Sequence, residues 1–204
     1  PDKIKEALLS DSSNMFSESG LDLAIEGIWE DAGNLNLKNL KGQAAFSKIK
    51  ETILDLLQKG DHLIGLGGDH SVSWPTIDAH AEIYPSLNIL HIDAHPDLYD
   101  SLLDNKYSHA SPFARLMESG KIKRLIQVGI RTLNKHQKDQ AERFGVEIHE
   151  MRDLSRVDKI NFEGPVFCSV DLDALDPAYA PGVSHFEPGG MTTRYLLDLL
   201  RTFK

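Results

Sequence analysis

The sequence predicts a three-layer α/β/α fold in which a mainly parallel sheet lies between two layers of helices. Short apolar runs typical of buried strands alternate along the chain with segments whose apolar residues recur at helical spacing. Strands and helices that alternate in this way form right-handed crossover units, and the sheet is then covered on both faces. The length of 204 residues fits one domain, residues 1–204.

The strongest strand signal is the apolar run Leu87–Ile92, which follows Pro85 and Ser86. Further strands are predicted over residues 62–66, 124–130, 146–151 and 166–170, with a short edge strand at 21–25. Helices are predicted over residues 1–9, 42–60, 73–84, 112–119, 135–144 and 192–203. Gly60, Gly120 and Gly145 follow three of these helices as expected stops, and Thr192 is expected to cap the last one.

Composition excludes several classes of protein. The apolar fraction of 41% and charged fraction of 26% are those of an ordinary globular protein. The formal charge of −9 argues against a nucleic-acid partner, because no basic stripe is available to neutralise phosphates. No apolar stretch approaches the roughly 20 residues of a membrane span, and the start has no signal-peptide pattern. The single cysteine, Cys168, is expected to be a core residue in a reducing, cytoplasmic environment.

Ionisable side chains follow three of the predicted strands. These candidate site residues are His70 in the first motif, Asp93, His95 and Asp97 in the second, and Asp171 and Asp173 in the third. Taken alone, each motif has an ordinary interpretation as a solvated loop, a helix cap, a strand-to-helix turn or a locally bonded histidine. Because parallel strands end at the same edge of a sheet, the three motifs are expected to converge there.

Four carboxylates within a few ångströms of one another require positive charge to balance them. Two divalent cations would balance the charge in full. Oxygen-rich ligands with a minority of imidazole and no thiolate favour Mn²⁺ over a structural zinc site. Two metals about 3.5–4 Å apart make a water nucleophilic at neutral pH, so hydrolysis is the expected reaction.

Three ordered motifs resemble those of the ureohydrolases, the superfamily of arginases and agmatinases. They are Gly67 to Ser71, Asp93 to Asp97 and Ser169 to Pro177. The segments 105–111 and 180–190 are most similar to plant-type arginases and bacterial agmatinase-like relatives. The resemblance covers about residues 60–204. It implies an arginase/deacetylase-like fold and a binuclear manganese enzyme that cleaves the guanidino C–N bond of agmatine, arginine or a related compound to urea and an amine.

The resemblance also implies roles for individual residues. One Mn²⁺ would be held by His70, Asp93, Asp97 and Asp171, and the other by Asp93, His95, Asp171 and Asp173. Asp97 would orient the attacking water and take its proton, and His109 would pass a proton to the leaving amine. His109 also suits this role by its place on a polar loop, where an imidazole titrates near neutrality. Its alternative is an exposed loop histidine.

A rigid segment that ends in Pro188, Gly189 and Gly190 is expected on the wall of the substrate crevice. His185 and Glu187 in this segment are candidate substrate contacts, with a purely structural loop as the alternative. Family precedent suggests a trimer or hexamer.

The chain departs from the family pattern at both ends. Family members carry a further strand before residue 1 and, after the last helix, a segment with a glutamate that pairs with the substrate guanidinium. The expectation is therefore a natural polypeptide longer than these 204 residues. Without that glutamate, binding and orientation of a guanidinium should suffer.

The sequence leaves three other functions open. One is a formiminoglutamase-type hydrolase, and another is a single-zinc amide hydrolase on the related deacetylase fold. The presence of both His70 and His95 argues against the latter. The third is an inactive metal-binding homologue that acts by association.

Overall fold

The computed structural model describes residues 1–203 and confirms the predicted α/β fold. Four strands in this part of the chain form one sheet in the order β3-β2-β1-β4, and every neighbouring pair is parallel. The strands are β1 (Leu87–Ile92), β2 (Ile122–Ile130), β3 (Glu147–Glu150) and β4 (Val166–Val170). The helices are α1 (Asp2–Leu8), α2 (Gln43–Gln58), α3 (Ser73–Ile83), α4 (Pro112–Glu118), α5 (Lys135–Phe144) and α6 (Thr193–Thr202), with short 3-10 turns at His70–Val72, Val157–Lys159 and Leu172–Ala174.

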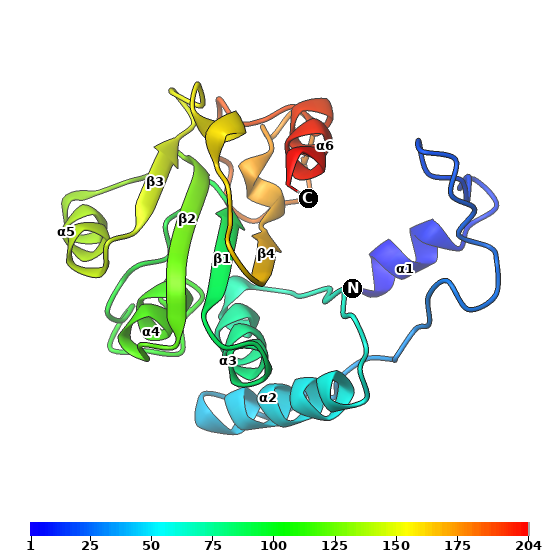
Figure 1. Ribbon diagram of the computed structural model, residues 1–204, viewed down its shortest axis with the longest axis horizontal. Coiled ribbons are helices and arrows are strands. Elements are labelled where there is room, and N and C mark those ends of the chain that lie inside the picture. The colour runs from blue at the N-terminus through cyan, green and yellow to red at the C-terminus, as the bar shows by residue number, and fades with distance from the viewer. Residues whose placement is uncertain (204) are drawn as a thin grey trace.

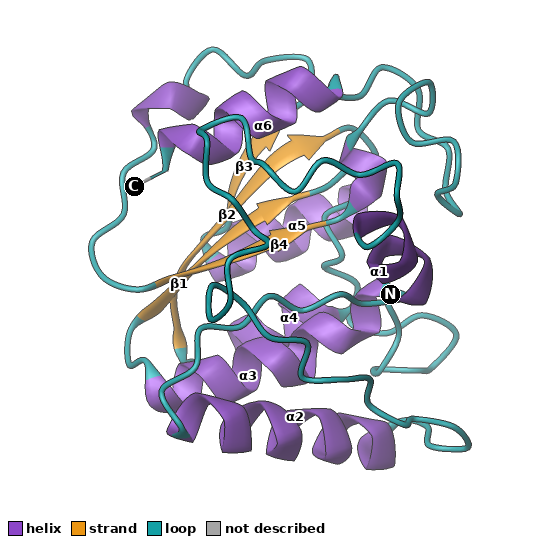
Figure 2. Cartoon of the chain, turned by 90° about the vertical axis from the view of Figure 1, so that its right-hand side faces the viewer, coloured by secondary structure: helices purple, strands orange, loops and turns teal. Residues whose placement is uncertain are grey.

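Helices cover both faces of the sheet. Figure 2 shows α6 on one side of the strands and α3 and α4 on the other, with α2 packed outside α3. Alternate residues of β1 point to opposite faces, as a strand requires. Leu87 and Ile89 enter the core formed with α3, α4 and α5, and Leu90 and Ile92 enter the core formed with α6. One core therefore lies on each face of the sheet, and the carboxyl ends of the parallel strands lie together at one edge.

The helix boundaries follow their capping residues. Thr192 accepts a hydrogen bond from the Tyr195 N–H (3.0 Å) and caps α6, as predicted. Asn134 caps α5 in the same way through the Gln137 N–H, and Gly145 ends α5 in the left-handed conformation. None of the described helices has the length and apolar character that crossing a membrane requires.

Residues 1–40 lie apart from the sheet. Figure 1 shows α1 and the loop after it beside the main body, and α1 buries none of its residues. Contacts with the body include Glu18, whose carboxylate accepts hydrogen bonds from Arg194 and Arg201 on α6. The predicted strand at residues 21–25 is wrong: the backbone turns there, and a single bridge joins Phe16 to Asp22.

The predicted strand at residues 62–66 is also wrong. This segment has no strand partner among residues 1–203, and Ile64 is 93% exposed. A strand is stable only when a neighbour accepts its backbone hydrogen bonds, and the apolar pattern of these residues does not reveal whether that neighbour is present.

Cys168 is exposed rather than buried in the core. It lies on β4, which is an edge strand of the described sheet, and its neighbours Val166 and Val170 are exposed as well. The sequence pattern identified a strand correctly but not its position in the sheet.

Gly129 allows the backbone of β2 to approach the segment after β1. Its φ is +96°, and a Cβ at this position would lie 2.8 Å from Met191 Cε and 3.1 Å from the Asp93 carbonyl oxygen. We therefore expect Gly129→Ala to lower the free energy of unfolding by about 1–3 kcal/mol, measured by urea denaturation. Gly145→Ala is the matched control, because Gly145 also has a positive φ but nothing within 4 Å of the added Cβ. An equal loss in the two variants would contradict the proposed close approach.

Candidate metal centre

The register of the sheet places two of the three polar motifs side by side. Ile92 pairs with Val170, so the next residues, Asp93 and Asp171, leave adjacent strands at the same level. The Asp171 N–H donates to the Ile92 carbonyl (2.9 Å), and the Asp93 N–H donates to the Val128 carbonyl on the other side (3.1 Å). Backbone hydrogen bonds therefore continue beyond the strands and fix where both carboxylates begin.

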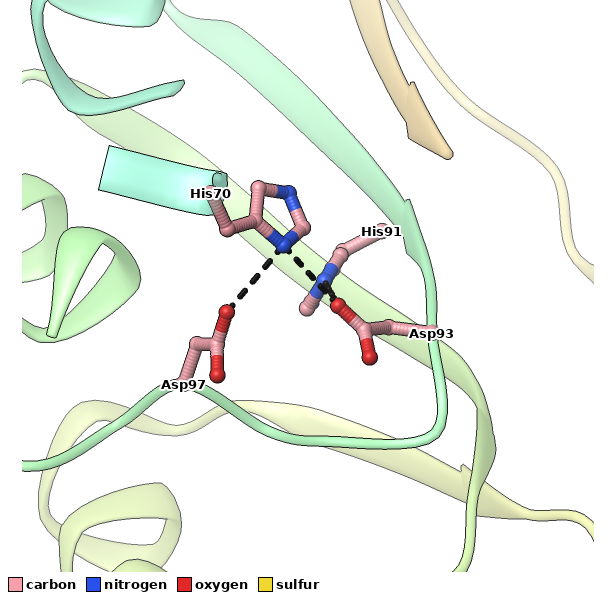
Figure 3. Close-up of side chains that lie close together, drawn as sticks. All are labelled: His70, His91, Asp93 and Asp97. Carbon is pink, nitrogen blue, oxygen red and sulfur yellow. Dashed lines mark hydrogen bonds and ion pairs between the residues drawn. The ribbon is translucent and has the colours of Figure 1, made fainter. Parts of the chain in front are cut away.

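A first group of side chains surrounds the Nδ1 atom of His70. This atom lies 3.0 Å from Asp93 Oδ2, 3.1 Å from Asp97 Oδ2 and 3.4 Å from Asp171 Oδ2. Figure 3 shows one ring nitrogen of His70 facing both Asp93 and Asp97, with His91 next to the Asp93 carboxylate. The structure thus brings together His70, two carboxylates from residues 93–97 and a third carboxylate, that of Asp171, so three segments of the chain meet here.

A second group shares Asp93 with the first. His95 Nδ1 lies 3.4 Å from Asp93 Oδ1 and 3.0 Å from Asp173 Oδ2. The other oxygen of Asp173 accepts a hydrogen bond from the Ala94 N–H (3.3 Å). The two oxygens of Asp93 therefore face different groups, which is the arrangement of a carboxylate that bridges two cations.

Asp97 is held in an uncommon backbone conformation with φ at +51°. The carbonyl of the preceding Pro96 accepts a hydrogen bond from Gln127 (2.6 Å), and the N–H of the following Leu98 donates to Gln137 (3.1 Å). Gln127 and Gln137 are both buried. These bonds turn the Asp97 side chain back toward His70.

Burial and mutual charge govern the protonation of the site. Burial raises the pKa of Asp97 to about 7 and also raises the pKa of Asp171. Burial disfavours the charged form of His70 and His95, but the adjoining carboxylates outweigh it and raise the pKa of His70 to about 10 and that of His95 to about 11. The carboxylates therefore favour the positively charged forms of the two histidines beside them.

The donor set fits a pair of divalent cations. His70 Nε2 contacts the Ser169 hydroxyl (2.9 Å), which leaves Nδ1 facing the carboxylates. Nδ1 is buried and, within residues 1–203, makes no hydrogen bond of suitable geometry, as expected of an atom that ligates a metal. The potential ligand atoms lie within 4.8 Å of one another in each of two sets, one of His70, His91, Asp93 and Asp97 and one of Asp93, His95 and Asp173. Carboxylate oxygens with a few imidazole nitrogens suit Mn²⁺.

The other predicted site residues lie beside the second group. Glu187 Oε1 is 3.4 Å from His95 Nε2, and the ring of His185 is 5.6 Å from the ring of His95. His109 is half-buried, and its ring centroid lies 5.9 Å from that of His185. His109, His185 and Glu187 therefore lie on the His95 side of the candidate centre, with His185 next to both His95 and His109.

Sequence reasoning missed Arg131, which ties together the loops that carry two site residues. Its guanidinium donates to the carbonyls of Asp173 (2.7 Å) and Glu187 (2.6 Å). Asp176 joins the same two loops a second time, because its carboxylate accepts hydrogen bonds from the N–H groups of Gly189 (2.7 Å) and Gly190 (3.3 Å). A backbone carbonyl can come from any residue type, so no sequence pattern could have identified these partners.

Sequence reasoning also missed His91 and Gln127, which are both fully buried. His91 Nε2 lies 2.8 Å from Asp93 Oδ2, and Gln127 Nε2 lies 3.0 Å from His91 Nδ1. His91 is two residues before Asp93 on an extended chain, so its side chain faces the same side. That spacing was the available signal.

Comparison with known proteins identifies the family of this centre. The model of the arginase family matches residues 1–204, which is the whole chain. The chain belongs to the arginase family. Its curated relatives include arginase 1, mitochondrial, from Arabidopsis thaliana, 40% identical over 220 residues, and agmatinase from Bacillus anthracis, 36% identical over 182 residues. These alignments cover 100% and 87% of this chain and 64% and 63% of the two relatives, so the chain spans less than two thirds of the length of either relative.

Solved structures of the family share the fold. The arginase from Medicago truncatula superposes with a TM-score of 0.90 at 41% sequence identity, over 100% of this chain and 69% of that one. Formimidoylglutamase from Bacillus subtilis superposes with a TM-score of 0.85 at 29% identity, over 98% of this chain and 67% of that one. Both the fold and the family expected from the three motifs are thereby confirmed.

Proposed function

We propose that this chain carries the binuclear manganese centre of a guanidino hydrolase that acts on arginine or agmatine and releases urea and an amine. The observation that carries the proposal is the pair of ligand groups that share Asp93, one around His70 Nδ1 and one around His95 Nδ1. Asp171, 3.4 Å from His70 Nδ1, is proposed as the second bridging carboxylate. Divalent cations held by these residues would supply a water that is nucleophilic at neutral pH.

The chain's own residues provide the rest of the chemistry. Asp97 is buried, with Oδ2 3.1 Å from His70 Nδ1, and we propose that its carboxylate takes a proton from the attacking water. The carboxylate of Glu187 at the half-exposed side of His95 adds negative charge where a cationic guanidinium would enter. We propose that His109, whose ring centroid lies 5.9 Å from that of His185, returns the proton to the leaving amine nitrogen.

A second candidate function is hydrolysis of a formimino group. It is supported by the similarity to formimidoylglutamase from Bacillus subtilis, which extends over 98% of this chain. The formimino carbon is planar and bonded to nitrogen, like the guanidino carbon, so the same side chains would serve both reactions. Identity is higher to the arginases and to the agmatinase from Bacillus anthracis, and this favours the guanidino substrates.

The test is a parallel assay of four substrates with the purified protein after incubation with Mn²⁺. Urea release is measured from arginine, agmatine and guanidinobutyrate, and formamide release from formiminoglutamate. We expect urea from arginine or agmatine, and we expect that release to stop on chelation and to return with added Mn²⁺. Formamide as the only product would establish the second candidate. A metal-loaded protein with no product from any of the four would contradict both and favour a binding role.

A further inference from the structure

His91 is the one fully buried histidine whose contacts, within residues 1–203, join the candidate metal centre to the interior of the sheet. It lies on β1 with 0% exposure, and its ring stacks on Phe113 of α4 with centroids 3.8 Å apart. Each ring nitrogen has a single polar contact, Nδ1 with Gln127 and Nε2 with Asp93. These contacts fix the orientation of the His91 ring, although His91 has no role in the proposed reaction.

Gln127 determines which nitrogen of His91 carries the hydrogen. The Gln127 amide nitrogen lies 2.6 Å from the Pro96 carbonyl, which only accepts, so this nitrogen is the donor end of the amide. Its second hydrogen points to His91 Nδ1, 3.0 Å away. Nδ1 must then be the unprotonated nitrogen, and Nε2 carries the hydrogen that is donated to Asp93 Oδ2 at 2.8 Å. With its hydrogen directed at Asp93, Nε2 has no lone pair to offer a metal.

The hydrogen bond from His91 completes the orientation of Asp93. Oδ1 accepts from the His95 N–H (2.6 Å), and Oδ2 accepts from His91 Nε2 (2.8 Å). Two donors on opposite oxygens prevent the carboxylate from rotating about its χ2 bond, and each oxygen keeps a lone pair for a cation. Asp93 is only 1% exposed, so water does not replace either donor.

We propose that His91 and Gln127 form a positioning pair that orients Asp93 to bridge two cations and so sets the affinity of the centre for Mn²⁺. This inference rests on the proposed metal centre. His91 acts through Asp93 and does not touch substrate. Gln127 also affects Asp97, because its amide donates a hydrogen bond to the carbonyl of Pro96, the residue before Asp97.

Three variants test the proposal through the dissociation constant of Mn²⁺, measured by calorimetry on the metal-free protein without substrate. His91→Phe keeps the stacking on Phe113 but removes the donor to Asp93, and we expect roughly 10–100-fold weaker binding. His91→Gln places an amide N–H near the former Nε2 and should recover most of the affinity. Gln127→Met leaves His91 in place but removes the amide that keeps His91 Nδ1 unprotonated. We therefore expect a smaller loss of Mn²⁺ affinity than in His91→Phe.

His80→Phe is the control. His80 is a half-buried histidine on α3 that contacts the Thr76 carbonyl and the Phe167 ring rather than the carboxylates, so its replacement should leave Mn²⁺ affinity unchanged. Equal affinity in folded His91→Phe and the unsubstituted protein would overturn the proposal, and so would a His91→Gln variant as weak as His91→Phe. If His91→Phe does not fold, Gln127→Met decides, since wild-type affinity in that variant would overturn it too. Failure of the unsubstituted protein to bind Mn²⁺ would instead remove the proposed function itself.

Discussion

Asp93→Asn is expected to lower urea release by at least about 10³-fold, because it removes several kcal/mol of transition-state stabilisation. Asp93 is the residue shared by both ligand groups, so its loss affects both cations. The amide cannot be accommodated in either orientation. One oxygen of Asp93 accepts from the His95 N–H and the other from His91, so the new NH₂ group must face a donor.

The measurement for Asp93→Asn combines the initial rate of urea release with the Mn²⁺ content of the folded variant. Asp139→Asn is the matched control, because Asp139 is an exposed aspartate on α5 that pairs with Lys135. We expect the control to keep full activity and metal content. Undiminished Mn²⁺ content in folded Asp93→Asn would show that Asp93 is not a bridging ligand.

His109→Asn is expected to lower kcat by about 10²–10⁴-fold, the usual contribution of a positioned proton donor. His109 is half-buried beside His185 and is not one of the proposed metal ligands, so the metal content should not change. The measurement is kcat with saturating substrate together with Mn²⁺ content. The combination of low kcat and full metal content separates a proton-transfer role from a ligand role.

Two observations would check the assignment of His109. His136→Asn is the control, since His136 is an exposed histidine that stacks on Tyr99 and lies on α5. Free imidazole in the assay should restore part of the activity of His109→Asn, because it can occupy the space left by the ring. Wild-type kcat in His109→Asn would eliminate the proposed shuttle.

Much of the fold could be predicted because its strands and helices carry their own local signals. The apolar run Leu87–Ile92 became β1, and Thr192 and Gly145 mark the ends of α6 and α5 as expected. Two of the errors share one cause. Residues 62–66 have a strand pattern but no partner within residues 1–203, and Cys168 has a core pattern but lies on an edge strand. Pairing and position in a sheet depend on segments far away in sequence, so a local pattern does not determine them.

The gathering of the site could be predicted from one topological rule. Parallel strands end at a common rim, and that rule predicts that Asp93 and Asp171 lie at the same edge of the sheet. The pairing of Ile92 with Val170, which the rule does not give, sets the two residues side by side. The supporting contacts could not be predicted in the same way. Arg131 binds backbone carbonyls, and Gln127 reaches His91 across 36 residues of sequence. Such contacts depend on rotamers and register, which a residue pattern does not specify.

The most direct test of the proposed centre is the number of Mn²⁺ ions bound per chain. The purified protein is stripped of metal, titrated with Mn²⁺ and assayed for bound metal by elemental analysis after removal of the free ion. Two ligand groups that share Asp93 predict two ions per chain, with both lost in Asp93→Asn. One ion per chain would point to a mononuclear amide hydrolase, and none would contradict the proposed centre altogether.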